Sequence, residues 1–174
     1  MKKILLVVVI IIFITLLLPL AIVWLIGGSG EGQSPIESGT VSVYVSEEDC
    51  VKDMDINEYL KCVVAAEMPA DFEEEALKAQ AVAARTYLYS HIAEKDKGNI
   101  AESHNGAAIC TDSTHCQAYI SEDKRRESWG AGADENWNKI STAVDETTGQ
   151  IMTYNDEIIS AVFHSTSSGI TESA

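Results

Sequence analysis

Positive charge is scarce in this chain of 174 residues, which has 12 Lys and Arg against 27 Asp and Glu and a formal net charge of −15. All 27 acidic residues but only 10 of the 12 basic ones follow residue 26, which leaves that part with −17. Such a charge repels phosphate backbones and anionic lipid, so we do not expect nucleic acid as a partner. The substrate should be neutral or carry local positive charge.

The sequence also lacks an internal repeat and a complete hydrolase triad. His164 is followed by Ser165, Ser167 and Ser168, which could suggest a serine nucleophile beside a histidine. No Asp stands at a defined position to complete a triad, so this signal is weak. A polar loop without a ligand explains the segment equally well.

Charge is absent altogether from residues 4–26, a run dominated by Ile, Leu and Val. At about 1.5 Å per residue this run spans a bilayer core of roughly 30 Å. A cleaved signal peptide would have a shorter apolar core and a small-residue cleavage site. We therefore expect a transmembrane helix over residues 4–26, with residues 1–3 as a cytoplasmic tip because two lysines precede the run.

The remaining sequence predicts an α+β domain over residues 40–174, in the extracytoplasmic part of a single-pass membrane protein. Residues 27–39 are rich in Gly and Ser and predict a flexible linker. Alternation over Val41–Val45 predicts a half-buried strand. Asp55 is an expected N-cap for a helix that ends near Glu67, since the residue before Pro69 avoids helical geometry.

Three further elements are expected downstream. A second helix should begin after Asp71, with three acidic residues in its first turn, and end near Gly98. Residues 99–132 are expected to be irregular. A third helix is predicted over residues 134–148, followed by a hairpin around Asn155-Asp156.

Glu67 has the most unusual setting of any charged residue in the sequence. It follows Leu60 by seven residues and Val63 by four, which puts it on the buried stripe of the first helix. Burial and the negative end of the helix dipole both favour the protonated carboxyl, as a general acid requires. The competing interpretation, slightly favoured by spacing alone, is a Glu paired with Lys or Arg inside the fold.

Lys78 and Arg85 are possible partners of Glu67 or of a substrate. They are seven residues apart and share one face of the predicted second helix. Spacing alone supports an ordinary solvated helix face equally well.

Two histidines and two cysteines within 13 residues form a candidate metal site: His104, Cys110, His115 and Cys116. Their number satisfies a structural zinc site, although the spacing is not that of a zinc finger. The alternative is a Cys110–Cys116 disulfide with the histidines on the surface. Cys50 and Cys62 could be a disulfide or buried thiols.

The strings EMPADFEEEALKAQAVAARTYLYS and FHSTSSGITES resemble stage II sporulation protein D and the related amidase-enhancer proteins. The resemblance implies a lytic transglycosylase that is anchored in the mother-cell membrane facing the forespore and cuts peptidoglycan glycan strands during engulfment in sporulation. It implies Glu67 as the catalytic acid/base and substrate-binding roles for Lys78, Arg85, His164 and Ser165. Zinc-binding members with a similar Cys/His arrangement favour a structural zinc at the four-residue cluster, with no organic cofactor.

The resemblance also implies a substrate stripped of stem peptides by a partner amidase, and membrane partner proteins of an engulfment complex. Because the family continues well over a hundred residues past this segment, residues 40–174 are expected to be only the N-terminal half of its domain. Two alternatives remain open. One is a non-catalytic glycan-binding module that recruits or enhances a cell-wall amidase, and the other is a structural scaffold.

Overall fold

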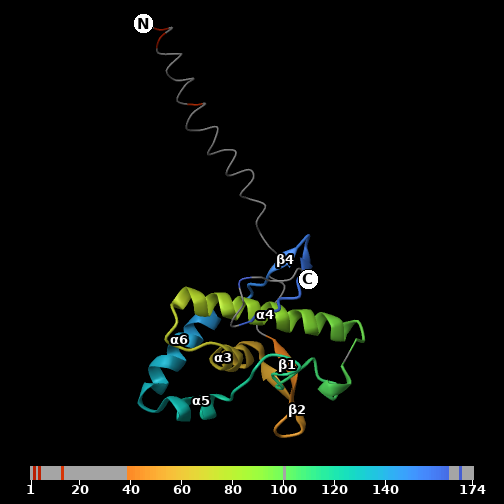
Figure 1. Cartoon of the computed structure of the whole chain (residues 1–174). Coiled ribbons are helices and arrows are strands. Elements are labelled where there is room, and N and C mark those ends of the chain that lie inside the picture. Colours follow the sequence, from red (N-terminus) through yellow and green to blue (C-terminus); the bar gives the residue numbers. More distant parts are fainter. Residues whose placement is uncertain are drawn as a thin grey trace. The chain divides into compact units, whose positions relative to one another are not determined.

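The computed structural model describes residues 39–99, 101–164 and 169, together with Lys2, Ile4 and Phe13 (Figure 1). The chain divides into two compact units, Met1–Pro35 and Ile36–Ala174. All strands and the longer helices described below belong to the second unit. The predicted linker over residues 27–39 lies outside the described residues, except for Gly39.

The expected membrane helix needs a correction. Within the described part of the chain, no helix is long and apolar enough to cross a membrane. The longest described helix has 23 residues, but its sequence contains several charged residues, among them Arg85. This finding contradicts the expected transmembrane helix over residues 4–26 and the single-pass membrane location. Apart from Ile4 and Phe13, that segment lies outside the described residues, and the described fold is α+β without a spanning helix.

A small mixed sheet opens the second unit, in the order β2-β1-β3. Strands β1 (Thr40–Val45) and β2 (Cys50–Asp55) are antiparallel, while β3 (Ile109–Cys110) runs parallel to β1. The predicted strand over Val41–Val45 is confirmed, because every second residue of β1 is buried. Strand β2 was not predicted, since its residues CVKDMD are mostly exposed and lack apolar alternation.

Helix α3 (Ile56–Glu67) begins and ends as predicted. The Asp55 carboxylate accepts hydrogen bonds from the backbone N–H groups of Asn57 and Glu58, which lack helical partners. Met68 is extended, as expected before Pro69, and terminates the helix. Seven of the 12 residues of α3 are buried, so the helix is covered on several sides.

Helix α4 (Glu74–Asp96) confirms the second predicted helix. Glu73 is its N-cap rather than a residue of the first turn, and Gly98 follows the helix with φ +86°, a conformation that glycine adopts without strain. Leu77, Ala81, Ala84 and Leu88 of α4 are buried, and Ile92 packs partly against the same core.

The segment predicted to be irregular, residues 99–132, contains three short described elements and one helix. Besides β3, it forms η2 (Glu102–His104), α5 (Glu122–Trp129) and η3 (Gly130–Gly132). No residue of α5 is buried, so it has no apolar stripe from which a sequence could predict a helix. Instead, Arg126 pairs with Glu122 and Asp134 and lies over the ring of Trp137.

Helix α6 (Ala133–Glu146) and the hairpin of β4 (Thr153–Tyr154) and β5 (Glu157–Ile158) complete the described unit. The third predicted helix is confirmed, but it ends two residues earlier than expected, with Thr147 as its C-cap. The predicted hairpin is confirmed, and each of its strands has two residues. Asn155 and Asp156 both have positive φ, as a tight two-residue turn requires.

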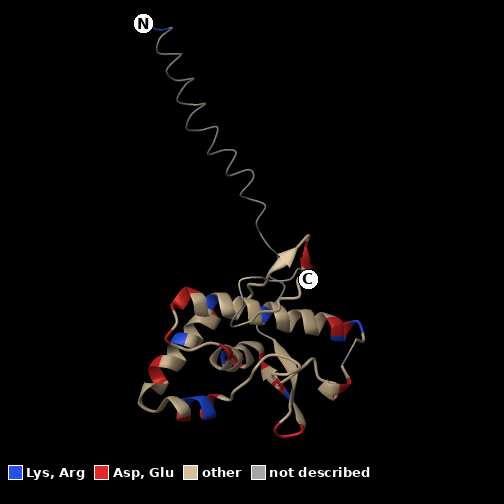
Figure 2. Cartoon of the chain, in the orientation of Figure 1, with Lys and Arg blue, Asp and Glu red and all other residues tan. Residues whose placement is uncertain are grey.

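Helix α3 lies at the centre of the unit, with α4 and α6 packed against it (Figure 1). Leu60, Val63 and Val64 of α3 are fully buried, together with Leu77 and Leu88 of α4 and Ile140 and Val144 of α6. Acidic residues occur at both ends of α4 and on the β1–β2 turn, whereas α5 has three consecutive basic residues after its acidic first turn (Figure 2). This packing places Glu67 at the end of the central helix.

Candidate functional site

Glu67 is the last residue of α3 and is half-buried. Its Oε1 accepts a hydrogen bond of 2.8 Å from the backbone N–H of Ala118, 51 residues away in sequence. Its Oε2 has no hydrogen-bond partner among the described residues, and neither oxygen takes part in an ion pair there. The carboxylate is therefore oriented through one oxygen, and the other is available to a ligand.

Lys78 does not pair with Glu67. Its Nζ lies 2.7 Å from both Glu74 and Glu146 and 3.1 Å from Glu75, which links α4 to the end of α6. The hydrogen bond with Glu146, followed by those with the other two, raises the pKa of Lys78. Lys78 lines a separate hollow beside Glu146 and Thr147. Its predicted substrate-binding role remains a prediction.

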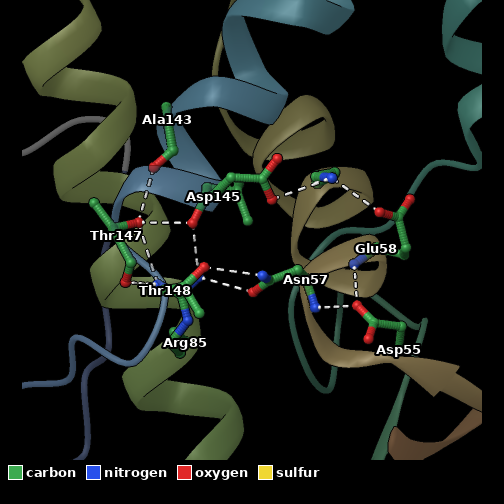
Figure 3. A network of polar contacts seen from close by, with 10 residues as sticks. Asp55, Asn57, Glu58, Arg85, Ala143, Asp145, Thr147 and Thr148 are labelled. Atoms are coloured by element: carbon green, nitrogen blue, oxygen red, sulfur yellow. Dashed lines mark hydrogen bonds and ion pairs between the residues drawn. The ribbon is translucent and has the colours of Figure 1, made fainter. Parts of the chain in front are cut away.

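Arg85 is enclosed by protein, with 1% of its surface exposed. Its guanidinium donates to the carbonyl oxygens of Thr147 at 2.6 Å and Val144 at 3.0 Å, and to Oδ1 of Asn57 at 3.2 Å (Figure 3). Those two carbonyls lie at the C-terminal end of α6, where helical partners are missing and the dipole is negative. Burial lowers the pKa of Arg85, yet an arginine stays charged at any physiological pH.

Together these contacts exclude, for the described residues, the interpretation that Glu67 is a structural partner of Lys78 or Arg85. Arg85 joins α4 to the end of α6 and to Asn57 at the start of α3, and Asn57 also donates to Thr148 at 2.9 Å (Figure 3). Its predicted role in substrate binding is untested. The structure places it in a polar network away from the residues that surround Glu67.

A hollow of about 320 Å³ surrounds Glu67. Its described lining residues come from α3, α4, the loop after β3 and the segment after β5; they are Glu67, Tyr87, Ser113, Cys116, Gln117, Val162, Phe163 and His164. Glu67 and His164, both predicted from the sequence, are thus brought to one place. Ser165 lies outside the described residues. Among the described lining residues, Glu67 is the only carboxylate.

Tyr87 and Gln117 are lining residues that the sequence analysis did not predict. Burial, and secondarily the nearby Cys116, raises the pKa of Tyr87 to about 12, so its hydroxyl stays protonated and can hydrogen-bond to a ligand. Gln117 is almost fully buried. No local pattern points to either residue, because the hollow joins segments that are far apart in sequence. The only signal is that Gln117 follows a predicted metal ligand.

The predicted metal ligands His104, Cys110, His115 and Cys116 do converge, with their ligand atoms all within 4.8 Å of one another. Nε2 of His104 lies 3.1 Å from Nδ1 of His115 and 3.2 Å from Sγ of Cys116, and Sγ of Cys110 lies 3.6 Å from Nδ1 of His115. A tetrahedral zinc site with Zn–N of about 2.0–2.1 Å and Zn–S of about 2.3 Å has edges of about 3.3–3.8 Å. The cluster could therefore hold a metal ion.

The neutral imidazole of His104 suits a cation, whereas the Cys116 thiol has to lose its proton to bind one. Burial, and secondarily His115, lowers the pKa of His104, which favours the neutral imidazole that binds metals. Burial raises the pKa of Cys116 to about 12, so without a cation its thiol keeps its proton. The second nitrogen of His115 lies 3.2 Å from Oγ of Ser103, a contact that orients the ring.

All four cysteines are free thiols, so the disulfide alternatives for both pairs are not found. Cys62 is a buried thiol whose pKa is raised to about 11 by burial.

The metal cluster and Glu67 are connected through consecutive residues. Cys116 is a ligand of the cluster, Gln117 lines the hollow, and Ala118 donates to the Glu67 carboxylate. An interaction that holds Cys116 in place therefore also restrains the backbone N–H of Ala118, which orients the Glu67 carboxylate.

Comparison with known proteins identifies the family of this chain. Residues 44–154 match the family described as stage II sporulation protein (SpoIID). The chain is 38% identical to stage II sporulation protein D of Bacillus amyloliquefaciens over 82% of its length, and 37% identical to that of Bacillus subtilis over 84%. It is 35% identical to the amidase enhancer of Bacillus subtilis over 66%. These matches cover 39%, 42% and 13% of the respective relatives, so the chain spans about two fifths of the sporulation proteins.

Proposed function

Because the chain belongs to the stage II sporulation protein (SpoIID) family, we propose that it carries the catalytic acid of a peptidoglycan lytic transglycosylase, Glu67. The observation that carries this proposal is the single carboxylate of the hollow, held at Oε1 and unpartnered at Oε2 among the described residues. Membership in this family indicates a role in sporulation. The reaction itself is our proposal.

A single carboxylate suits this reaction. Most glycosidases need two carboxyl groups, one as the acid and one as the base or nucleophile. In a lytic transglycosylase the C6 hydroxyl of the sugar attacks C1, so no second carboxylate has to activate water. Glu67 gives its proton to the glycosidic oxygen as the C1–O bond breaks, and then accepts the proton of the C6 hydroxyl as the new C6–O–C1 bond forms.

The neighbours of Glu67 support its orientation in such a reaction. The N–H of Ala118 fixes one carboxyl oxygen, so the proton belongs on Oε2, which faces no described partner. Tyr87 and His164 line the same hollow and can hydrogen-bond to sugar hydroxyls. We expect Ser165, next in sequence to His164, to do the same.

We further propose that His104, Cys110, His115 and Cys116 hold a structural zinc ion. Four protein ligands complete the tetrahedral shell and leave no open position for a substrate or water, so zinc would stabilise the loop rather than take part in chemistry. Its contribution to the site is indirect, through the short connection from Cys116 to Ala118.

The proposed substrate is glycan stripped of stem peptides, cut during engulfment of the forespore, with a cell-wall amidase as the partner that prepares it. One relative is named amidase enhancer, which supports a partnership with such an enzyme. That name equally favours a second candidate function, in which the chain binds glycan and enhances an amidase without cutting.

Product analysis separates the two functions. Peptide-free glycan strands are incubated with the chain, and soluble fragments are identified by mass spectrometry. A lytic transglycosylase releases fragments with 1,6-anhydro ends. Binding without any fragments would support the amidase-enhancing module, and fragments with reducing ends would show a hydrolase instead.

A further inference from the structure

Gln117 is a polar residue of the hollow that the reaction above does not use. It has 3% of its surface exposed, and its amide nitrogen donates to the carbonyl oxygen of Ala84 at 3.4 Å. That contact sets the orientation of the amide, because the flipped amide would place the Gln117 oxygen against the carbonyl oxygen of Ala84. The amide oxygen is therefore directed away from Ala84.

The amide oxygen of Gln117 has no hydrogen-bond partner among the described residues, although it is buried. Buried polar atoms are nearly always satisfied, so each exception requires an explanation. Three other buried side-chain atoms of the described part share this state: Tyr59 Oη, Gln80 Nε2 and Arg125 Nε. Of the four residues, only Gln117 lines the hollow that contains Glu67.

The position of Gln117 is tied to that of Glu67. It stands between Cys116 of the metal cluster and Ala118, whose N–H binds the Glu67 carboxylate. A ligand group that binds to Gln117 is consequently held at a fixed place relative to the proposed catalytic acid. An amide oxygen only accepts hydrogen bonds, so that ligand group must be a donor.

We propose that Gln117 is a substrate-positioning residue, whose amide oxygen accepts a hydrogen bond from a hydroxyl or acetamido N–H of the sugar bound beside Glu67. This inference rests on the proposed function, since it takes a glycan as the ligand of the hollow. A sugar donor satisfies the one buried side-chain atom without a partner among the described residues of the hollow. An analogue without that donor would leave the oxygen unsatisfied, which gives the site selectivity.

The test measures binding without catalysis. Chitotetraose, a chain of four N-acetylglucosamine units, is titrated into the full chain carrying Glu67→Gln, with and without Gln117→Met, by calorimetry. Met keeps the length of the side chain but removes the acceptor. We expect affinity to fall by about fivefold or more, the effect of one hydrogen bond, with an unchanged or higher melting temperature because an unsatisfied polar atom is removed.

Gln80→Met is the matched control, since Gln80 also has a buried amide atom without a described partner but lies outside the hollow. It should leave the affinity unchanged. Repeating the titration with cellotetraose, which has hydroxyls but no acetamido group, tells which donor is used: a loss with both sugars indicates a hydroxyl, and a loss with chitotetraose alone indicates the acetamido N–H.

Equal affinity with and without Gln117→Met would overturn the inference, as would an affinity loss accompanied by a lower melting temperature or reproduced by Gln80→Met. The proposed function would stand in those cases if the chain with Glu67 intact still released anhydro fragments. If chitotetraose did not bind at all and no fragments were released, the inference about Gln117 and the proposed function would both be wrong.

Discussion

At the scale of single residues, the two most important polar side chains of this fold are held by backbone groups. The Glu67 carboxylate is oriented by the N–H of Ala118, and the Arg85 guanidinium donates to carbonyl oxygens at the end of α6. Neither has an opposite charge as its direct partner among the described residues. Arg85 therefore stabilises the junction of three helices, whereas Glu67 keeps one oxygen for a ligand.

Removing Arg85 should destabilise the protein. Arg85→Met removes one donor from the carbonyls of Val144 and Thr147, which keep the Thr147 hydroxyl and the Gln150 N–H, and leaves the amide oxygen of Asn57 without a described donor. Hydrogen bonds from a charged group contribute about 1.5–3 kcal/mol each, and rearrangement offsets part of the loss, so we expect the free energy of unfolding to fall by about 2–4 kcal/mol. Urea denaturation followed by circular dichroism measures this loss.

Lys78→Met is the control, because the Lys78 ammonium pairs with carboxylates at the surface and should matter less to stability. If Arg85→Met unfolded at the same urea concentration as the parent but bound glycan weakly, the structural interpretation of Arg85 would be wrong. The predicted substrate-binding role would then be favoured.

Local sequence patterns singled out part of this candidate site. The apolar neighbours of Glu67 and its place at a helix end are local, but spacing alone slightly favoured an ion-paired Glu, and the family resemblance supplied the catalytic role; the four proposed metal ligands lie within 13 residues. Gln117 and Tyr87 depend on contacts between distant segments, which no local pattern encodes. Spacing could not distinguish a solvated Arg85 from a buried one, because the partners of Arg85 are backbone carbonyls 59 and 62 residues away.

At the scale of elements, the loop between β3 and α5 has no fully buried apolar residue of its own. Between Thr111 and Ser121 only Gln117 is buried, and Cys110 is buried at the end of β3. A bound metal would fix both ends of the turn that contains Asp112 and Thr114. Metal binding to the folded state stabilises it by about 2.7 kcal/mol when the free metal exceeds its dissociation constant a hundredfold.

Removing the metal should expose thiols. In protein purified with zinc, a thiol reagent should react with Cys50 but not with the ligands Cys110 and Cys116, nor with Cys62, which is buried with a pKa raised to about 11. After a chelator is added, the two ligand thiols should also react and the melting temperature should fall. Elemental analysis should find one zinc per chain before chelation. No metal and no gain in reactive thiols would contradict the proposed site.

The N-cap of α3 should contribute measurably to stability, because α3 is the central helix. Asp55→Ala removes the acceptor for two backbone N–H groups and should lower the free energy of unfolding by about 1 kcal/mol. Asp53→Ala, in the exposed strand β2, changes the same charge without removing a cap and should have little effect. Equal losses in both variants, measured by urea denaturation, would point to charge rather than to capping.

Elements with strong local signals were predicted well, and those without were not. Helix α3 has a side-chain N-cap, α4 has acidic residues in its first turn and a glycine after its end, and the Asn155-Asp156 turn has the residue types that tolerate positive φ. Helix α5 has no buried residue and is held by Arg126, whose partners become visible only in the folded chain. Strand β2 is an exposed edge strand, which pairs through its backbone and needs no apolar pattern.

At the scale of the whole molecule, one compact unit over Ile36–Ala174 brings together a central helix, a candidate metal cluster and a hollow with one carboxylate. The strings that resemble the family come from the end of α3, from α4 and from the segment after β5, and these segments line the hollow together with the loop after β3. The chain spans about two fifths of the sporulation proteins it matches, so the activity of the whole protein is a proposal.

The measurement that tests the central claim most directly is the activity of Glu67→Gln on peptide-free glycan. The amide keeps an oxygen for the Ala118 N–H but has no proton to give, so release of anhydro fragments should fall by about 10²–10⁴-fold. Melting should be unchanged or slightly improved, because no described cation loses a partner. An unchanged yield of anhydro fragments from Glu67→Gln would contradict the assignment of Glu67 as the catalytic acid.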